Sequence, residues 1–139
     1  MAPAKELAER LGLQFDDLTL LSQALIHSSY VHEQPSAGLS NERLEFLGDA
    51  VVNLAISEAL YTRHPEEDEG YLSARRAAIV STTGLARLAG RLDLGSSLLL
   101  GEGEAQRSGR RRPSLLASTF EAVAGALYLD LGFEPVKPG

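Results

Sequence analysis

The sequence has 139 residues, 44% of them hydrophobic, which is enough for one buried core and too little for two full domains. It contains no cysteine, which excludes disulfide bonds and thiolate metal sites and favours hard ions such as Mg²⁺ or Mn²⁺ at any metal site. The formal net charge of -6 opposes nucleic-acid binding unless basic and acidic residues are segregated.

The arginines are in fact concentrated in the second half of the chain, a pattern that can accommodate both phosphates and cations: Arg75, Arg76, Arg87, Arg91, Arg107, Arg110, Arg111 and Arg112. No stretch approaches the ~20 consecutive apolar residues of a membrane span. The first ten residues lack the basic and then apolar layout of a secretory signal. We therefore expect a cytoplasmic protein with no membrane partner.

Apolar residues recur at helical spacing in several segments, and no segment shows sustained strand alternation, so the sequence predicts an all-α fold. A first helix is expected from about residue 4 to 11, ended by Gly12. A second helix follows the capping pair Asp16 and Asp17 and continues to about residue 26.

Residues 27–40 have the composition of a loop. The longest helix is expected to run from about residue 41 to 61, started by the capping residues Ser40 and Asn41.

Three more helices are predicted in the second half. Two of them cover about residues 69–80 and 82–92, with Ser81 as the cap between them. Residues 101–112 are rich in glycine and charge and predict an exposed loop, and Pro113 then begins a last helix that reaches about residue 130.

The longest predicted helix carries a polar stripe. With ~100° per residue, Glu42, Glu45, Asp49 and Asn53 fall within an arc of roughly 80°. Most other positions of this helix are apolar, which is typical of a buried helix, and a buried carboxylate costs several kcal/mol unless a cation or hydrogen-bond donors compensate it. A metal ion and an arginine both remain possible compensators, and a solvated helix face is the simplest alternative.

The last predicted helix contributes one isolated acid, Glu121. Its apolar face lies elsewhere on the helix, while Ser118, Glu121 and Gly125 lie together. A capping box formed by Ser118 and Glu121 is the alternative interpretation. Pro113 argues for a helix that begins several residues earlier.

The run from Asn41 to Val51, NERLEFLGDAV, resembles the signature of the ribonuclease III family. Other segments similar to that family occur in the expected order, so that the resemblance covers nearly the whole chain: residues 24–30, residues 69–73 followed by Arg76 and Ala77, residues 108–112 and residues 116–122.

The resemblance implies a single helical domain over residues 1–139 that pairs with a second copy and receives duplex RNA in a valley. Glu45, Asp49 and Glu121 are then metal-binding catalytic carboxylates, with Glu42 and Glu69 as supporting acids. Paired Mg²⁺ ions suit the hydrolysis of a phosphodiester, and Mn²⁺ can substitute.

Three further roles are expected from this resemblance or from the loop composition. Phe46 matches an aromatic residue that inserts into the partner subunit, and ordinary core packing is its alternative. His27 is expected to be a hydrogen-bonded structural residue. The loop arginines are candidates for contacts to the RNA backbone, with a solvated charged loop as the alternative: Arg107, Arg110, Arg111 and Arg112.

The sequence departs from the family pattern in two places. Ser118 stands where the family has an aspartate that helps to hold metal, so we expect weaker metal binding, or a preference for Mn²⁺ or for more Mg²⁺. The tail from Gly132 resembles the start of a linker, and no double-stranded-RNA-binding domain is expected within the chain. RNA affinity should therefore be weak and strongly dependent on salt.

The leading hypothesis is a metal-dependent endoribonuclease that cuts double-stranded RNA to give staggered ends with short 3′ overhangs, as in RNA processing. The main alternative is a degenerate family member that acts as an RNA-binding or dimerisation module. A third interpretation is a helical dimer whose acidic stripe is neutralised by arginines.

Overall fold

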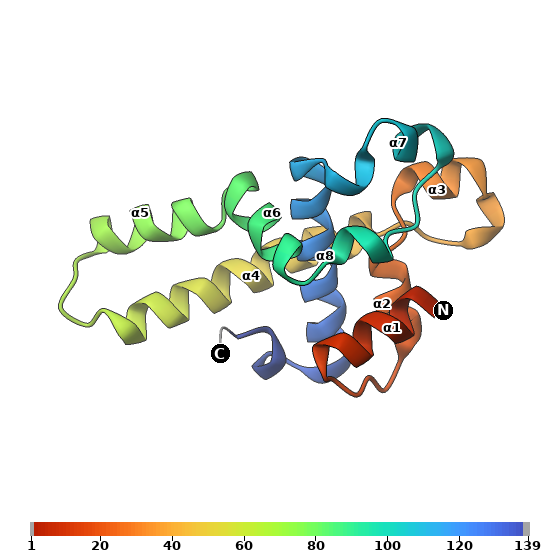
Figure 1. The fold of residues 1–139 in the computed structure, drawn as a ribbon. Coiled ribbons are helices and arrows are strands. Elements are labelled where there is room, and N and C mark those ends of the chain that lie inside the picture. Colours follow the sequence, from red (N-terminus) through yellow and green to blue (C-terminus); the bar gives the residue numbers. More distant parts are fainter. Residues whose placement is uncertain (1, 138–139) are drawn as a thin grey trace.

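The computed structural model describes residues 2–137, and every long element in this range is a helix (Figure 1). Within these residues, Ile26 and Leu99 form an isolated parallel β-bridge. The α-helices are α1 (Ala2–Leu11), α2 (Leu18–Ala24), α3 (Ser28–Glu33), α4 (Glu42–Arg63), α5 (Glu69–Ile79), α6 (Thr82–Arg91), α7 (Glu102–Gln106) and α8 (Pro113–Leu131). Short 3₁₀ turns cover Pro35–Ala37, Leu94–Ser97, Gly109–Arg111 and Glu134–Val136.

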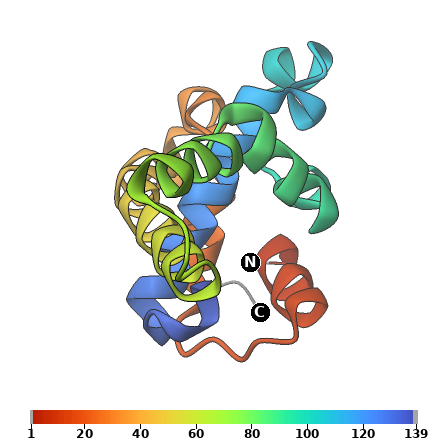
Figure 2. The same ribbon diagram turned by 90° about the vertical axis from the view of Figure 1, so that its left-hand side faces the viewer.

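Helix α8 lies at the centre of the domain and packs mainly against α4, α6 and α2 (Figures 1 and 2). It is long and apolar enough to cross a membrane by length and composition alone. Its residues from Ala122 to Leu127 are all buried within the domain. The apolar composition of α8 is therefore accounted for by its place in the core.

The helices that begin or end at a clear capping signal lie where the sequence predicts them. Helix α1 ends before Gly12, which has a φ of 69°. The side chain of Asp17 accepts a hydrogen bond from the Thr19 N–H at the start of α2, and the side chain of Ser81 does the same for Gly84 at the start of α6. Pro113 is the first residue of α8.

Two segments that the sequence predicts as loops contain short helices instead. Residues 27–40 include α3, and residues 101–112 include α7 and a 3₁₀ turn. Neither α3 nor α7 has a fully buried residue, so neither leaves an apolar period in the sequence. Two hydrogen bonds join the start of α7 to α3. The backbone N–H of Gly101 donates to Ser29 Oγ, and that of Glu102 donates to a carboxylate oxygen of Glu33, both at 2.9 Å.

Two predicted boundaries also need correction. Helix α2 ends at Ala24 and not at residue 26, because Ile26 leaves the helix to pair with Leu99. The tail does not leave the domain as a linker before Lys137. Val136 packs against the apolar core, and Lys137 forms an ion pair with Glu58 of α4 at 2.9 Å.

The backbones of α4 and α8 touch where they cross. A β-carbon on Gly48 would overlap the carbonyl oxygen of Glu121 and would lie 3.1 Å from the backbone nitrogen of Gly125. A β-carbon on Gly125 would likewise overlap the carbonyl oxygen of Leu44. Only glycine permits so close an approach of two helices at these positions. The crossing brings the α4 residues on either side of Gly48 next to Glu121.

We predict that Gly48→Ala lowers the free energy of unfolding by about 3 kcal/mol or more, because the added methyl group must push two helix backbones apart. Gly90→Ala in α6 is the control, since a β-carbon there meets no atom within 4 Å. That change should be neutral or stabilise the chain by roughly 0.5–1 kcal/mol. Urea unfolding followed by circular dichroism measures both, and equal stability of the two variants would contradict the close crossing.

Candidate functional site

Three of the expected acids lie around the crossing of α4 and α8. Glu45 and Asp49 lie on α4 before and after Gly48, and the backbone of Glu121 on α8 contacts Gly48 directly. Burial raises the pKa of Glu121 from its ordinary value of 4.5 to about 8, and a hydrogen bond with Asp49 and the charges of Asp49 and Glu45 add to this rise. The fold therefore places the carboxyl groups of Asp49 and Glu121 in contact, with Glu45 nearby.

The acids are more exposed than the sequence predicts. Glu45 and Glu121 are half-buried, whereas Glu42 and Asp49 are exposed. The expectation that the acids of α4 lie in buried surroundings is wrong for Glu42 and Asp49, because this side of the helix, which also carries the exposed Phe46, is not covered within the single chain. The site is consequently open to solvent and to a large ligand.

The oxygen donors around the crossing suit a hard divalent cation. Within residues 2–137, however, no three acidic or histidine side chains converge closely enough to hold an ion. Asp49 and Glu121 are in direct contact, while Glu45 acts on Glu121 only through its charge. A cation bound by all three would require a change in side-chain rotamers.

A hollow of about 170 Å³ lies beside these acids. Glu42 and Glu45 line it from α4, and Ser118 lines it from α8, one helical turn before Glu121. Because α8 begins at Pro113, Ser118 and Glu121 lie inside the helix, and the capping-box alternative is wrong. The hollow brings the expected ligand Ser118 and the supporting acid Glu42 to the same place as Glu45.

Asn41 has a positioning role that the sequence does not reveal. Its buried side-chain amide donates to the carbonyl oxygen of Ala24 at 3.0 Å and does not cap α4. Ser40 Oγ instead accepts the N–H of Glu42 at 3.3 Å. Asn41 thus ties the start of α4, with its acids, to the end of α2.

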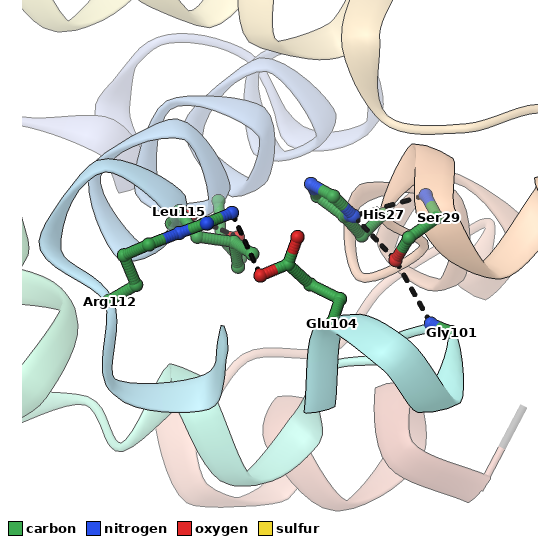
Figure 3. A network of polar contacts seen from close by, with 7 residues as sticks. His27, Ser29, Gly101, Glu104, Arg112 and Leu115 are labelled. Atoms are coloured by element: carbon green, nitrogen blue, oxygen red, sulfur yellow. Dashed lines mark hydrogen bonds and ion pairs between the residues drawn. The ribbon is translucent and has the colours of Figure 1, made fainter. Parts of the chain in front are cut away.

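The hollow is bordered by a polar network that joins α3, α7 and the start of α8 (Figure 3). His27 Nδ1 accepts a hydrogen bond from the Ser29 N–H at 3.1 Å, and Arg112 forms an ion pair with Glu104 at 2.9 Å. Burial lowers the pKa of His27, against the opposing charge of Glu104. The expectation that His27 is a hydrogen-bonded structural residue is confirmed.

The loop arginines divide into two pairs. Arg110 donates to the carbonyl oxygens of Gly95 at 3.1 Å and Leu98 at 2.6 Å, and Arg112 is paired with Glu104. Two of the four expected RNA contacts therefore have partners inside the domain. Arg107 and Arg111 are exposed and have no ion-pair partner in the described part of the chain.

Two other expected site residues lie away from the crossing. Glu69 starts α5 and lines a hollow with Tyr61 near the far end of α4, roughly 18 Å along the helix from Asp49 at 1.5 Å per residue. It is therefore not a neighbour of the other acids in the single chain. Phe46 is 84% exposed, so the alternative that it packs in the core of its own chain is wrong.

Comparison with protein families gives one match over most of the chain. The model of a family described as ribonuclease-III-like matches residues 17–138. A protein named Ribonuclease 3 from Pelotomaculum thermopropionicum is 52% identical over 129 residues, which cover 92% of this chain and 54% of the relative. Ribonuclease 3 from Desulforamulus reducens is 53% identical over 132 residues, covering 94% and 54%. The chain thus spans about half the length of these relatives.

Solved structures similar to this chain include a nuclease domain of the same family. The nuclease domain of ribonuclease III from Campylobacter jejuni superposes with a TM-score of 0.86 at 38% identity, covering 98% of this chain and 89% of that one. Dicer from Pichia stipitis gives a TM-score of 0.60 at 26% identity, covering 86% of this chain and 48% of that one.

The raised pKa of Glu121 predicts a pH-dependent stability in the absence of metal. Between pH 4.5 and 8 the folded chain holds a proton on Glu121 that the unfolded chain releases, so stability falls as the pH rises through this window. Glu121→Gln should reduce this slope and stabilise the chain at pH 8 by about 1 kcal/mol, a figure reduced for solvent screening.

Denaturant unfolding at a series of pH values, in the presence of a chelator, measures this effect. Glu6→Gln on the exposed side of α1 is the matched control and should leave the slope unchanged. A slope that is the same for Glu121→Gln and for the unmodified chain would contradict the raised pKa of Glu121.

Proposed function

This chain belongs to the ribonuclease-III-like family, and on that basis we propose that residues 1–139 act as the nuclease domain of an endoribonuclease that hydrolyses double-stranded RNA. The products are staggered ends with short 3′ overhangs, and the setting is RNA processing in the cytoplasm. The observation that supports this proposal best is the contact of acids from two helices at the α4–α8 crossing. Neighbouring carboxyl groups with a perturbed pKa are typical of functional sites, and a bound cation removes the repulsion between them.

Glu45, Asp49 and Glu121 are the proposed ligands of Mg²⁺, with Mn²⁺ as a substitute, and Ser118 adds a neutral oxygen. When bound, the ion supplies positive charge that neutralises the phosphate and lowers the pKa of water. In its absence the pKa of Glu121, raised to about 8 by burial and by the hydrogen bond with Asp49, keeps the Glu121 carboxyl group protonated near neutral pH. Glu45 and Glu42 line the adjoining hollow, where their carboxylate oxygens can accept hydrogen bonds from water or from a hydroxyl group of the RNA.

The proposed substrate is recognised by its shape. The deep, narrow major groove of duplex RNA prevents side chains from reading bases, so contacts to phosphates and 2′-hydroxyls carry the recognition. The exposed Arg107 and Arg111 can supply phosphate contacts. With a net charge of -6, the affinity should be weak and should fall steeply with salt.

We further propose that the chain pairs with a second copy through the uncovered face of α4. Phe46, Leu54 and Tyr61 are 84%, 57% and 75% exposed, and their spacing places them on one side of this helix. The nuclease domain of ribonuclease III from Campylobacter jejuni has a region involved in dimer formation. A structure of that domain is 39% identical and superposes with a TM-score of 0.86, covering 95% of this chain and 89% of that one. A chain that sediments as a monomer at high concentration would contradict this pairing.

Two observations favour the alternative of an RNA-binding or dimerisation module without catalysis. Ser118 brings no negative charge to the site, and the acids do not converge on one point without rotamer changes. Against this alternative, a chain freed from catalysis gains nothing from keeping Glu121 in contact with Asp49, where its ionised form is disfavoured.

Incubation with long duplex RNA and Mg²⁺ or Mn²⁺ tests the proposed activity. We expect fragments that disappear with a chelator and with Glu121→Gln, and that persist with Glu6→Gln. Loss of one group that acts only in catalysis should lower the rate at least 100-fold. Binding without cleavage would replace the enzyme by the module, and neither binding nor cleavage would leave only the structural dimer.

The neutral hydroxyl of Ser118 is proposed to weaken the binding of Mg²⁺. Replacement by aspartate adds a charged ligand one turn from Glu121, so Ser118→Asp should lower the Mg²⁺ concentration needed for half-maximal cleavage by about tenfold, a difference of about 1.4 kcal/mol in binding. Ser114→Asp is the control, because Ser114 lies in the same hollow but at the start of α8. Identical Mg²⁺ curves for the unmodified chain and Ser118→Asp would remove the idea that Ser118 weakens metal binding.

A further inference from the structure

Helices α5 and α6 form a basic groove away from the acidic crossing. The groove has a volume of about 280 Å³, and three arginines line it, Arg75 from α5 and Arg87 and Arg91 from α6. The lining also includes the apolar residues Ala78, Ile79 and Leu88. We call these three side chains and the space between them the arginine groove.

The tight corner between the two helices creates this groove. Ser81 caps α6 by accepting the N–H of Gly84 at 3.0 Å. A β-carbon on Gly84 would lie 2.8 Å from the carbonyl oxygen of Ala78, and closer still to that of Ile79, so glycine lets the first turn of α6 pack on the end of α5. Arg87 and Arg91 are four residues apart and share one face of α6.

The charge of this region is opposite to that of the rest of the chain. Residues 70–92 contain four arginines and no aspartate or glutamate, although the whole chain has a net charge of -6. The fourth arginine, Arg76, donates to Ser57 Oγ of α4 at 2.9 Å and lines a different hollow. The arginine groove is therefore a local concentration of positive charge in an acidic protein.

The groove arginines have no carboxylate partner among residues 2–137. The guanidinium carbon of Arg75 lies 6.0 Å from the ring centre of Tyr71, a contact that leaves its N–H donors available. Arg110 and Arg112 of the 107–112 loop, by contrast, already bind carbonyl oxygens and Glu104. Of the two basic regions, the arginine groove thus has the larger number of guanidinium groups with neither a carboxylate partner nor a hydrogen bond to a carbonyl oxygen among residues 2–137.

We propose that the arginine groove binds backbone phosphates of duplex RNA, as a contact surface separate from the 107–112 loop. Guanidinium groups bind phosphate oxygens with two parallel hydrogen bonds, and contacts of this kind fix the position of a duplex without reading its sequence. Three arginines that line one groove from two helices suit an extended polyanion better than a single small anion. This inference deepens the proposed function and rests on it.

The test measures binding of a fluorescent RNA duplex by anisotropy over a range of salt concentrations, in Ca²⁺ or without metal. The test variant is Arg87→Gln with Arg91→Gln, and the matched control is Lys5→Gln with Arg63→Gln, which removes the same charge from exposed positions on α1 and α4. Each lost phosphate contact should reduce the slope of log K against log salt by about 0.9. The groove variant should therefore lose about 2 from the slope and bind about tenfold more weakly, and the control should change neither by a comparable amount.

Arg87→Lys with Arg91→Lys keeps the charge and should retain most of the slope, which separates lost contacts from misfolding. If the unmodified chain cleaves duplex RNA but the groove variant keeps its slope, the groove proposal is overturned and the nuclease stands. If cleavage is absent but the groove variant still loses its slope relative to the control, the nuclease proposal fails and the groove is supported. A chain that binds no duplex RNA at low salt overturns both.

Discussion

The contact between the backbones of α4 and α8 is the constraint on which the rest of this domain depends. Gly48 and Gly125 let the two longest helices touch, and a methyl group at either position would overlap a carbonyl oxygen of the other helix. Most of the core then assembles around α8, with α2 and α6 on its other sides. The same contact fixes Glu121 beside the α4 residues that flank Gly48, so that packing of the core and placement of the acids have one cause.

The α4–α8 crossing carries negative charge, whereas α5 and α6 carry positive charge. Glu121 is protonated near neutral pH because burial, the hydrogen bond with Asp49 and the neighbouring negative charges raise its pKa to about 8. The segment 70–92 carries arginines and no acid. Acidic and basic groups are thus separated in space, which allows one small domain to offer a site for a cation and a surface for phosphates.

The sequence predicts those parts of the fold that rest on local signals. Caps at Asp17 and Ser81, the glycine at residue 12 and Pro113 set helix ends correctly. It does not predict α3 and α7, because these short helices depend on contacts with each other. It also misjudges α4, since an apolar period cannot distinguish a face that packs in the core from one that stays exposed, as Phe46 does. The family-like motif predicts which acids belong to the site. It cannot predict that Arg110 binds carbonyl oxygens or that Glu69 lies far from the other acids, because both depend on tertiary structure.

We propose that the acids of α4 and α8 at the crossing form a site for a divalent cation. Crystals of the chain soaked in manganese test it most directly, because the anomalous signal locates the ion independently of any activity. We expect an anomalous peak at coordination distance from Glu45, Asp49 and Glu121, about 2.1 Å from the nearest carboxylate oxygens, as for a hard octahedral ion. A well-ordered crossing with no peak beside these three carboxyl groups would contradict it.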